Sequence, residues 1–341
     1  MHDLLPQLNQ WLETDKTIMI ATVTATWGSA PRPIGSKMIF TPDGTMHGSV
    51  SGGCVETAVI STGLDQPSRS QQLTFGVSDE TAQSVGLACG GQISVFLTPL
   101  DHALYQFLQP HWHQHTPTAT ITIIATPTNH LGRQMALTPA GDQYNDLGPH
   151  TATARQLAHD ALTNHTSHTH QLDDGTQLFI DIHLPPPTLI IIGAVHIAIH
   201  LVTFARAIGY QTIIIDPRRT FASGDRFAHA DHCHSLWPRK AFATIPLTNQ
   251  TAVALLSHDP KIDDPALRLA LDSPAFYIGA LGSRRTQAAR RQRLQADGYA
   301  ETQLARLHGP IGLNIHARTP AEIALAIMAE IVAVQRAPTD E

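Results

Sequence analysis

The second half of the chain alternates buried strands with helices, and this alternation limits the fold more than any other feature of the sequence. Residues 189–192 form an unbroken run of Leu and Ile, which is typical of a central parallel strand buried on both faces. Gly193 and an apolar helix over 197–208 follow this strand. Further strands are expected at 212–215, 252–257 and 275–279. Such βαβ units predict a Rossmann-like, doubly wound parallel sheet over residues 188–341.

The run Pro185-Pro186-Pro187 separates this half from a different pattern of elements. A proline run is stiff and cannot continue a helix, so it serves as a spacer between domains. Two domains also suit a chain of 341 residues, because single cores seldom grow to that size. The N-terminal domain, 1–184, is expected to be of α+β or α/β type. Its expected strands are 18–26, 36–40, 46–50, 72–75, 92–98, 118–125 and 178–183, its helices are 4–13, one beginning at Cys54, 103–108 and 151–163, and 127–149 is expected to be rich in loops.

A glycine-rich turn before a helix carries a thiol. Residues 36–50 read as a hairpin with an Asp-Gly turn, and Gly52, Gly53 and Cys54 follow it directly. Cys54 is expected in the first helical turn, where backbone N–H groups lack partners and the helix dipole favours an anion and a lowered thiol pKa. The pattern predicts a reactive or ligating sulfur. The alternative is a tight turn with Cys54 as a small buried apolar residue.

A second thiol and a basic loop belong to the same domain. Cys89 also lies among glycines, and two cysteines in such settings favour a shared site over two chance core positions. The Pro-rich loop 28–37 carries Arg32 and Lys37. It is not a P-loop, because six residues separate its glycines and Ser36 precedes the lysine. As a rigid loop it could still hold an anion through Arg32 or Lys37.

The first turn of the Rossmann half departs from the dinucleotide-binding fingerprint. That fingerprint requires G-x-G-x-x-G/A and an acid about 20 residues later. Gly193 and Ala198 match its first and third positions, but Val195 replaces the second glycine, which normally lets the backbone approach a pyrophosphate. His196 belongs to the same turn, and Asp216 is correctly placed for a ribose hydroxyl. NAD(P) binding is therefore weakened but not excluded, and the alternative is a nucleotide-type fold with another use.

Two other turns lie at the same edge of the expected sheet, where ligands of open α/β sheets bind. Their candidate residues are His258, Asp259, Gly282, Ser283, Arg284 and Arg285. The second turn offers backbone N–H groups and two guanidinium groups to a phosphate. The alternative is that its arginines only face solvent at a helix start. Because positive charge is unfavourable at a helix N-terminus, we favour a functional role.

Charge and composition argue against several classes of protein. The net charge of −6 argues against nucleic acid as the main partner. The N-terminus lacks the basic start and apolar core of a signal peptide, and a glycine and two histidines interrupt the apolar run 188–205. We therefore expect neither secretion nor a membrane span. Three cysteines are few, which favours reduced thiols in the cytoplasm over disulfides.

The 21 histidines are many for this length, and they are densest at 229–234 and 165–170. Imidazole and thiolate are zinc ligands, but neither group has a recognised ligand spacing, and both lie in polar sequence that reads as loop. Since histidine is also spread over the rest of the chain, we attribute the two groups to composition rather than to a metal site.

Together these motifs resemble the XdhC/CoxI family, whose members are accessory factors of xanthine dehydrogenase and related molybdenum hydroxylases. The resemblance rests on several long motifs that occur in order along nearly the whole chain, and it is weakest between about 100 and 175. The motifs are Trp27–Gly35, Gly48–Glu56 and Leu87–Gly91 in the first half, and Leu189–His196, Asp216–Arg218, His258–Lys261, Tyr277–Arg285, His308–Leu313 and Arg318–Ala324 in the second.

The resemblance implies a protein that binds the molybdenum cofactor, protects it during sulfuration and delivers it to the apo-hydroxylase. Soft thiolates of Cys54 and Cys89 would then lie by the molybdenum. Arg32, Lys37 or the turn at Arg284 would hold the phosphate of the pterin. The resemblance further implies a xanthine dehydrogenase-type client, a cysteine desulfurase as a second partner, and a homodimer.

Two other classes of function stay open. One is an NAD(P)-dependent oxidoreductase that uses the Rossmann half. Against it stand Val195, where the family usually has the second glycine of Gly-Ala-Gly-His, and the lack of an obvious set of proton- or hydride-transfer residues. The other is an interaction scaffold with buried, inert cysteines, which a near-zero thiol reactivity of the folded protein would favour.

Overall fold

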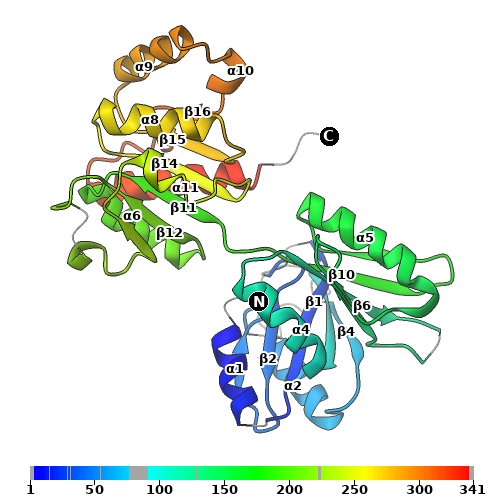
Figure 1. Cartoon of the computed structure of the whole chain (residues 1–341). Coiled ribbons are helices and arrows are strands. Elements are labelled where there is room, and N and C mark those ends of the chain that lie inside the picture. Colours follow the sequence, from blue (N-terminus) through cyan, green and yellow to red (C-terminus); the bar gives the residue numbers. More distant parts are fainter. Residues whose placement is uncertain are drawn as a thin grey trace. The chain divides into compact units, whose positions relative to one another are not determined.

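The computed structural model describes residues 4–14, 16–28, 30, 32–53, 55–76, 91–127, 129–221 and 224–337. The contacts of the chain divide it into two compact units, Met1–Pro185 and Pro186–Glu341, so the division falls within the proline run. Figure 1 shows the helices and strands of both units. No helix among the described residues is long and apolar enough to span a membrane.

The N-terminal unit contains two antiparallel five-stranded sheets, in the orders β3-β2-β1-β5-β4 and β8-β7-β6-β10-β9. The strands of the first sheet are β1 (Met19–Gly28), β2 (Lys37–Phe40), β3 (Met46–Gly48), β4 (Gln71–Gly76) and β5 (Gly91–Pro99). Those of the second are β6 (Thr118–Ala125), β7 (Gln134–Leu137), β8 (Gln143–Tyr144), β9 (His168–Gln171) and β10 (Gln177–His183). The predicted hairpin is confirmed, since β2 pairs with β3 across the Asp-Gly turn.

Side chains alternate between the two faces of each strand, so each sheet has two faces that can be covered. The helices and the two sheets of this unit therefore stack in layers. The helices are α1 (Leu5–Glu13), α2 (Glu56–Asp65), α4 (His102–His113), α5 (Thr151–Asn164) and the short 3₁₀ helix η1 (Gly148–His150). One face of the first sheet packs on α2, and the far face of the second sheet packs on α5. Apolar residues of α1 and α4 form one cluster with residues of both sheets, and Phe96, Ile124 and Phe179 form a small cluster between the sheets.

The C-terminal unit contains one six-stranded parallel sheet in the order β13-β12-β11-β14-β15-β16. Its strands are β11 (Thr188–Ile192), β12 (Gln211–Ile215), β13 (His232–His234), β14 (Thr251–Leu255), β15 (Tyr277–Ala280) and β16 (Leu307–His308). Counted within the unit, this is the order 3-2-1-4-5-6 of a Rossmann fold. The strand order reverses between β11 and β14, and ligands of such sheets bind at this point.

Helices cover both faces of this sheet (Figure 1). One face packs on α6 (His196–Ala207) and α11 (Pro320–Gln335). The other packs on α7 (Pro238–Ala241), α8 (Pro260–Leu271), α9 (Arg284–Ala296) and α10 (Glu301–Leu304), and the 3₁₀ helix η2 spans Gly224–Phe227. The predicted Rossmann-like, doubly wound sheet is therefore confirmed.

Some segments that read as loops contain strands. Residues 127–149 include β7 and β8, and the histidine-dense segments 165–170 and 229–234 include parts of β9 and β13. The strands β8, β9 and β13 lie at sheet edges, and their polar side chains are largely half-exposed. An edge strand of this kind lacks the apolar alternation by which sequence reveals a strand, so β8, β9 and β13 were missed. Outside β7, β8 and η1, the described residues of 127–149 contain no helix or strand, as expected for a loop-rich segment.

Candidate functional site

The turn between β3 and α2 is wound around one carboxylate. Glu56 is buried, and its two oxygens accept six hydrogen bonds of 2.5 to 3.1 Å. The donors are the hydroxyls of Ser49 and Ser51 and the backbone N–H groups of Val50, Ser51, Gly52 and Gly53. Burial alone would raise the pKa of Glu56, but the bonds from Ser51, Ser49 and Gly52 outweigh burial and hold that pKa below its ordinary value.

This winding changes what the turn offers to a ligand. Helix α2 begins at Glu56 with Val55 as its N-cap, so it starts after Cys54 rather than at it. The N–H groups of residues 50–53, which would otherwise suit an anion, are occupied by the chain's own carboxylate. Gly52 and Gly53 have φ of +102° and +133°, which only glycine adopts readily. Cys54 itself and Cys89 lie outside the described residues.

The basic loop lies directly beside this turn. Arg32 Nε donates to the carbonyl oxygen of Ser49 at 3.3 Å, and the Ser49 N–H donates to the carbonyl oxygen of Lys37 at 3.1 Å. A surface pocket of about 320 Å³ is lined by residues 32–37 and Leu4. Among the described residues, no acceptor is bonded to the two terminal nitrogens of Arg32. Arg32 thus faces a pocket of ligand size with a guanidinium that is held at one nitrogen.

Lys37 has a different environment from Arg32. Its ammonium is buried between the two sheets, where it is paired with Asp181 of β10 and donates to the carbonyl oxygen of Gly35 at 3.3 Å. His183 Nε2 lies 3.4 Å from the same carboxylate. Burial alone would raise the pKa of Asp181, but Lys37 and His183 outweigh it and hold that pKa below its ordinary value. Lys37 is therefore committed to an internal ion pair.

In the C-terminal unit, the predicted turns meet at one edge of the sheet. The N–H of Leu256 donates to Ile192 O at 2.8 Å, and that of Leu281 donates to Leu255 O at 2.9 Å, so the turns after β11, β14 and β15 lie side by side. A Cβ on Gly193 would lie 2.7 Å from the backbone nitrogen of Ser257, so only glycine fits there. Val195 caps α6, and His196 is the first residue of that helix.

Asp216 follows β12 as predicted, but its carboxylate is fully used within the chain. It accepts from Ala194 N at 2.8 Å, and from Arg218 N, Nε and Nη2 at 2.9, 2.9 and 2.7 Å. These four bonds occupy about all the acceptor positions of a carboxylate, and Asp216 is completely buried. Burial would raise its pKa, but the bonds from Arg218 and Ala194 outweigh that effect and lower it.

This arrangement does not fit the recognition of NAD. A ribose hydroxyl needs a free acceptor on the acid after the second strand, and Asp216 has none unless Arg218 moves away. The Arg218 guanidinium also stacks on Phe221, with its carbon 4.1 Å from the ring centroid. Together with Val195 in the first turn, these contacts leave the edge without the second glycine and without the free acid that recognise NAD.

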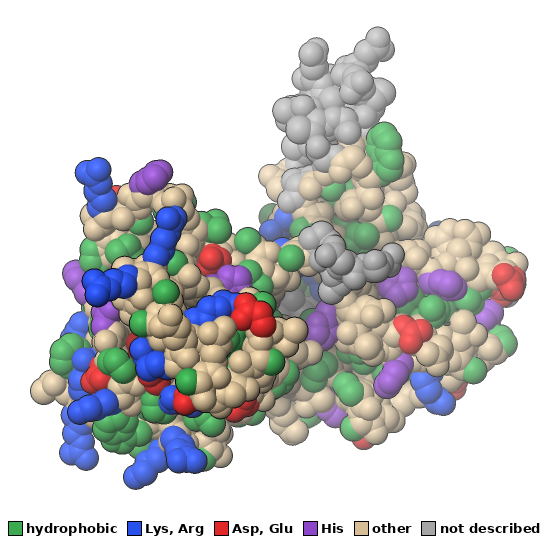
Figure 2. All heavy atoms as spheres, turned by 90° about the horizontal axis from the view of Figure 1, so that it is seen from above, with side chains coloured by type: hydrophobic (Ala, Val, Ile, Leu, Met, Phe, Trp, Pro, Cys, Tyr) green, Lys and Arg blue, Asp and Glu red, His purple; other side chains and the backbone are tan. Residues whose placement is uncertain are grey.

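The other two turns keep exposed polar groups. His258 has a left-handed φ of +61°, and Asp259 caps α8 by accepting from Lys261 N at 2.9 Å. Gly282 and Ser283 precede α9, and Ser283 caps that helix. Arg284 and Arg285 are exposed in its first turn, and neither has an acidic partner among the described residues. Figure 2 shows further Lys and Arg side chains crowded on this unit, at the left of the view.

Two features of the N-terminal unit were not anticipated from the sequence. One sequence signal could have predicted the role of Glu56: it is an acid at the start of a helix that follows a turn rich in Ser and Gly. Acids at such positions bond to preceding backbone N–H groups. The pairing of Lys37 with Asp181 had no such signal, because 144 residues separate them. Among the described residues, no group of three or more His, Cys, Asp or Glu side chains is arranged to hold a metal ion.

Fold and site together define a two-unit α/β protein, in which a Rossmann-like unit follows a unit with a glycine-rich cysteine turn. A model of the XdhC and CoxI family matches residues 11–76, and a model of the XdhC Rossmann domain matches residues 189–331. The chain belongs to the XdhC and CoxI family. The resemblance seen in the sequence motifs is confirmed.

Relatives of known name are similar to the chain over almost its whole length. A probable xanthine dehydrogenase subunit of Bacillus subtilis is 27% identical over 96% of both chains. The molybdenum cofactor insertion chaperone PaoD of Escherichia coli is 29% identical over 95% of this chain and 85% of its own. A crystal structure of a xanthine dehydrogenase from Bacillus halodurans superposes with a TM-score of 0.80 at 25% identity, over 98% of this chain and 96% of that one.

Proposed function

We propose that this chain binds the molybdenum cofactor, protects it, and delivers it to a molybdenum hydroxylase of the xanthine dehydrogenase type. Similarity over 95% of the chain to a protein named as a molybdenum cofactor insertion chaperone supports a role in maturation of this cofactor. The structural observation behind the proposal is that the pocket lined by Arg32 adjoins the turn whose N–H groups bond to Glu56, a junction made by the bond from Arg32 to Ser49. At this junction the Arg32 guanidinium is available to an anion, and it lies beside residues 49–53, which precede Cys54 in the sequence.

The residues of this junction have separable roles in the proposal. Arg32 binds the phosphate of the pterin, because its terminal nitrogens can form a bidentate contact while Ser49 holds Nε. Cys54 and Cys89 contact the molybdenum, since thiolates are soft ligands. Lys37 is left out of the phosphate site, because its ammonium is buried against Asp181. Glu56 fixes the path of the chain up to Gly53, which directly precedes Cys54 in the sequence.

The C-terminal unit contributes a second anion contact in the same proposal. The turn from Gly282 to Arg285 offers two exposed guanidinium groups that are free of acidic partners among the described residues. These groups suit a phosphate or an acidic surface of the client enzyme. From the family resemblance we add a cysteine desulfurase as the sulfur donor, a homodimer as the working form, and the cytoplasm as its location.

Delivery to a client tests the proposal. The chain is loaded with molybdenum cofactor without oxygen and mixed with cofactor-free xanthine dehydrogenase, and activity is followed over time. We expect faster and more complete activation than with the same amount of free cofactor, and slower loss of the cofactor on exposure to air. Arg32→Ala should weaken both effects, whereas Arg69→Ala, an exposed arginine elsewhere in the same unit, should not. Equal activation by free and loaded cofactor would refute the proposal.

A further inference from the structure

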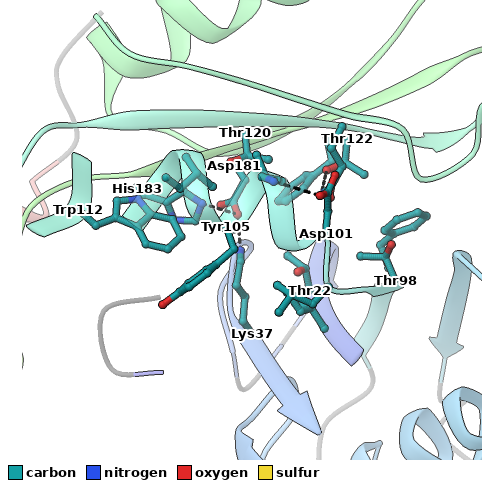
Figure 3. Close-up of a pocket in the computed structure, with 17 residues that line it drawn as sticks. Thr22, Lys37, Thr98, Asp101, Tyr105, Trp112, Thr120, Thr122, Asp181 and His183 are labelled. Atoms are coloured by element: carbon teal, nitrogen blue, oxygen red, sulfur yellow. Dashed lines mark hydrogen bonds and ion pairs between the residues drawn. The ribbon is translucent and has the colours of Figure 1, made fainter. Parts of the chain in front are cut away.

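A cavity lies between the two sheets of the N-terminal unit. Its volume is about 70 Å³, and both sheets and α4 contribute to its wall (Figure 3). Much of the wall is apolar, with Phe96 and Phe179 from the sheets and Leu104 and Leu108 from α4. An apolar cavity of about 150 Å³ takes up benzene, which has six heavy atoms, so this one suits a molecule of about three heavy atoms. It is far too small for a pterin cofactor, and the inference below is independent of the proposed function.

One hydroxyl on the wall lacks a hydrogen-bond partner. On β6, Thr118, Thr120 and Thr122 are buried and alternate with apolar residues that pack toward α5. Thr118 accepts from Trp112 Nε1 at 2.9 Å, and Thr122 accepts from Gln134 Nε2 at 3.0 Å. Thr120 lies between them on the cavity wall, is only 6% exposed, and its Oγ1 has no partner among the described residues.

An unpaired buried hydroxyl is unfavourable, so its presence on a cavity wall points to an occupant that bonds to it. In register on the sheet, Thr120 is opposite Asp181 of β10. The hydroxyl therefore lies at the polar end of the cavity, where Figure 3 shows Lys37, Asp181 and His183 close together.

The charges at this end select the charge of the occupant. The side chains of Lys37, Asp181 and His183 are only 8 to 9% exposed, and the lysine is paired with the aspartate. The charge of Lys37 is thus already compensated by Asp181. The other carboxylate on the wall, Asp101, already accepts from Ala103 N, Leu104 N and Tyr144 Oη. A bound anion at this end would lie against Asp181, and a bound cation would lie against Lys37. A neutral oxygen can bond to the Thr120 hydroxyl without this cost.

We propose that the cavity is a binding site for a small neutral molecule with one hydroxyl or carbonyl oxygen and a short apolar part. Its oxygen bonds to Thr120 Oγ1, and its carbon atoms lie against Phe96, Phe179 and the two leucines of α4. A short-chain alcohol is the simplest member of this class. Because affinity is limited by the number of heavy atoms, a ligand of this size binds at about millimolar concentrations.

Fluorine NMR with the full chain tests this site. The probe is 2-fluoroethanol, and its charged counterparts are 2-fluoroethylammonium and fluoroacetate. Thr120→Val removes the hydroxyl at nearly constant shape, and it should fold, because the lost group has no partner. Leu108→Phe fills the cavity from α4. Thr153→Val, at an exposed position on α5, is the matched control.

We expect saturable binding of 2-fluoroethanol to the wild type and to the Thr153 variant, and binding of the charged probes at least about tenfold weaker. The Thr120 variant should bind about fivefold to tenfold more weakly, and the Leu108 variant should not bind. Three results would each overturn the proposal: no saturation up to about 50 mM, equal binding by wild type and both cavity variants, or tighter binding of a charged probe.

Discussion

Replacement of Glu56 tests the central structural feature of the candidate site. In Glu56→Gln, the amide oxygen can keep the four donors that now bond to Oε1, namely the Ser49 hydroxyl and the N–H groups of Val50, Ser51 and Gly52. The amide nitrogen replaces Oε2, which now accepts from Ser51 Oγ and Gly53 N. The serine hydroxyl can rotate to accept, but the Gly53 N–H is left facing a donor.

The expected cost follows from these contacts. Loss of the charge weakens four bonds, and one backbone N–H loses its partner, which together should cost about 2–3 kcal/mol. Glu56→Ala leaves all six donors without this partner and should cost about 4 kcal/mol, even if water enters. For a unit of this size, the Gln variant should lower the Tm by about 5–10 °C.

Guanidinium unfolding followed by tryptophan fluorescence measures the loss. Trp11 and Trp112 are buried in the N-terminal unit, whereas Trp237 in the other unit is half exposed, so the signal reports mainly on the unit that contains Glu56. Glu13→Gln, at an exposed position on α1, is the matched control and should change stability by less than about 0.5 kcal/mol.

The effect should also depend on pH with a definite sign. The folded pKa of Glu56 is lowered, so its ionised form stabilises the fold fully above the unfolded pKa of about 4.3. This contribution is lost as the pH falls through the folded value. The difference between wild type and Glu56→Gln should therefore be largest at neutral pH and shrink below about pH 4. A difference under about 1 kcal/mol at neutral pH, or one that does not change with acid, would refute this reasoning.

Three further predictions concern the two units. Lys37→Met leaves the Asp181 carboxylate buried without its cation and should cost about 3–5 kcal/mol in urea unfolding, and the double variant with Asp181→Leu should recover most of that loss. Calorimetric titration with NAD should show no saturable binding up to about 1 mM, because Asp216 has no free acceptor; micromolar binding would contradict this. Tyr277→Phe removes a bond to the half-buried Glu330 and should lower the free energy of unfolding of the C-terminal unit by about 1–2 kcal/mol, as measured by hydrogen exchange of β15.

The fold of the C-terminal half was predictable because its central strands are buried on both faces. Such strands read as unbroken apolar runs, and the turns after them must lie at one edge of the sheet. The positions of Gly193, Asp216 and the Arg284 turn at that edge followed directly. The edge strands β9 and β13 did not, because their polar side chains resemble those of loops.

The chemistry at each position was less predictable than the position. Asp216 lies where a ribose-binding acid belongs, but a neighbour only two residues away in sequence, Arg218, uses its acceptors. From the sequence, Lys37 was predicted to be a free cation in a loop. In the structure it is paired with Asp181, which lies 144 positions away in the sequence. From the sequence, the N–H groups of the turn after Gly48 were predicted to be available to an anion. In the structure, those of Val50 and Ser51 donate to Glu56. Each case depends on a side-chain partner that only the folded chain reveals.

An anaerobic equilibrium titration with molybdenum cofactor tests the proposed cofactor role most directly. It compares the wild type with the double variant Cys54→Ser/Cys89→Ser and with Cys233→Ser, a half-buried cysteine on β13 of the other unit, as the control. We expect tight binding by the wild type and the control, and binding weakened by at least about tenfold in the double variant. No binding by the wild type, or equal binding by all three proteins, would contradict a thiol site for the cofactor in the N-terminal unit.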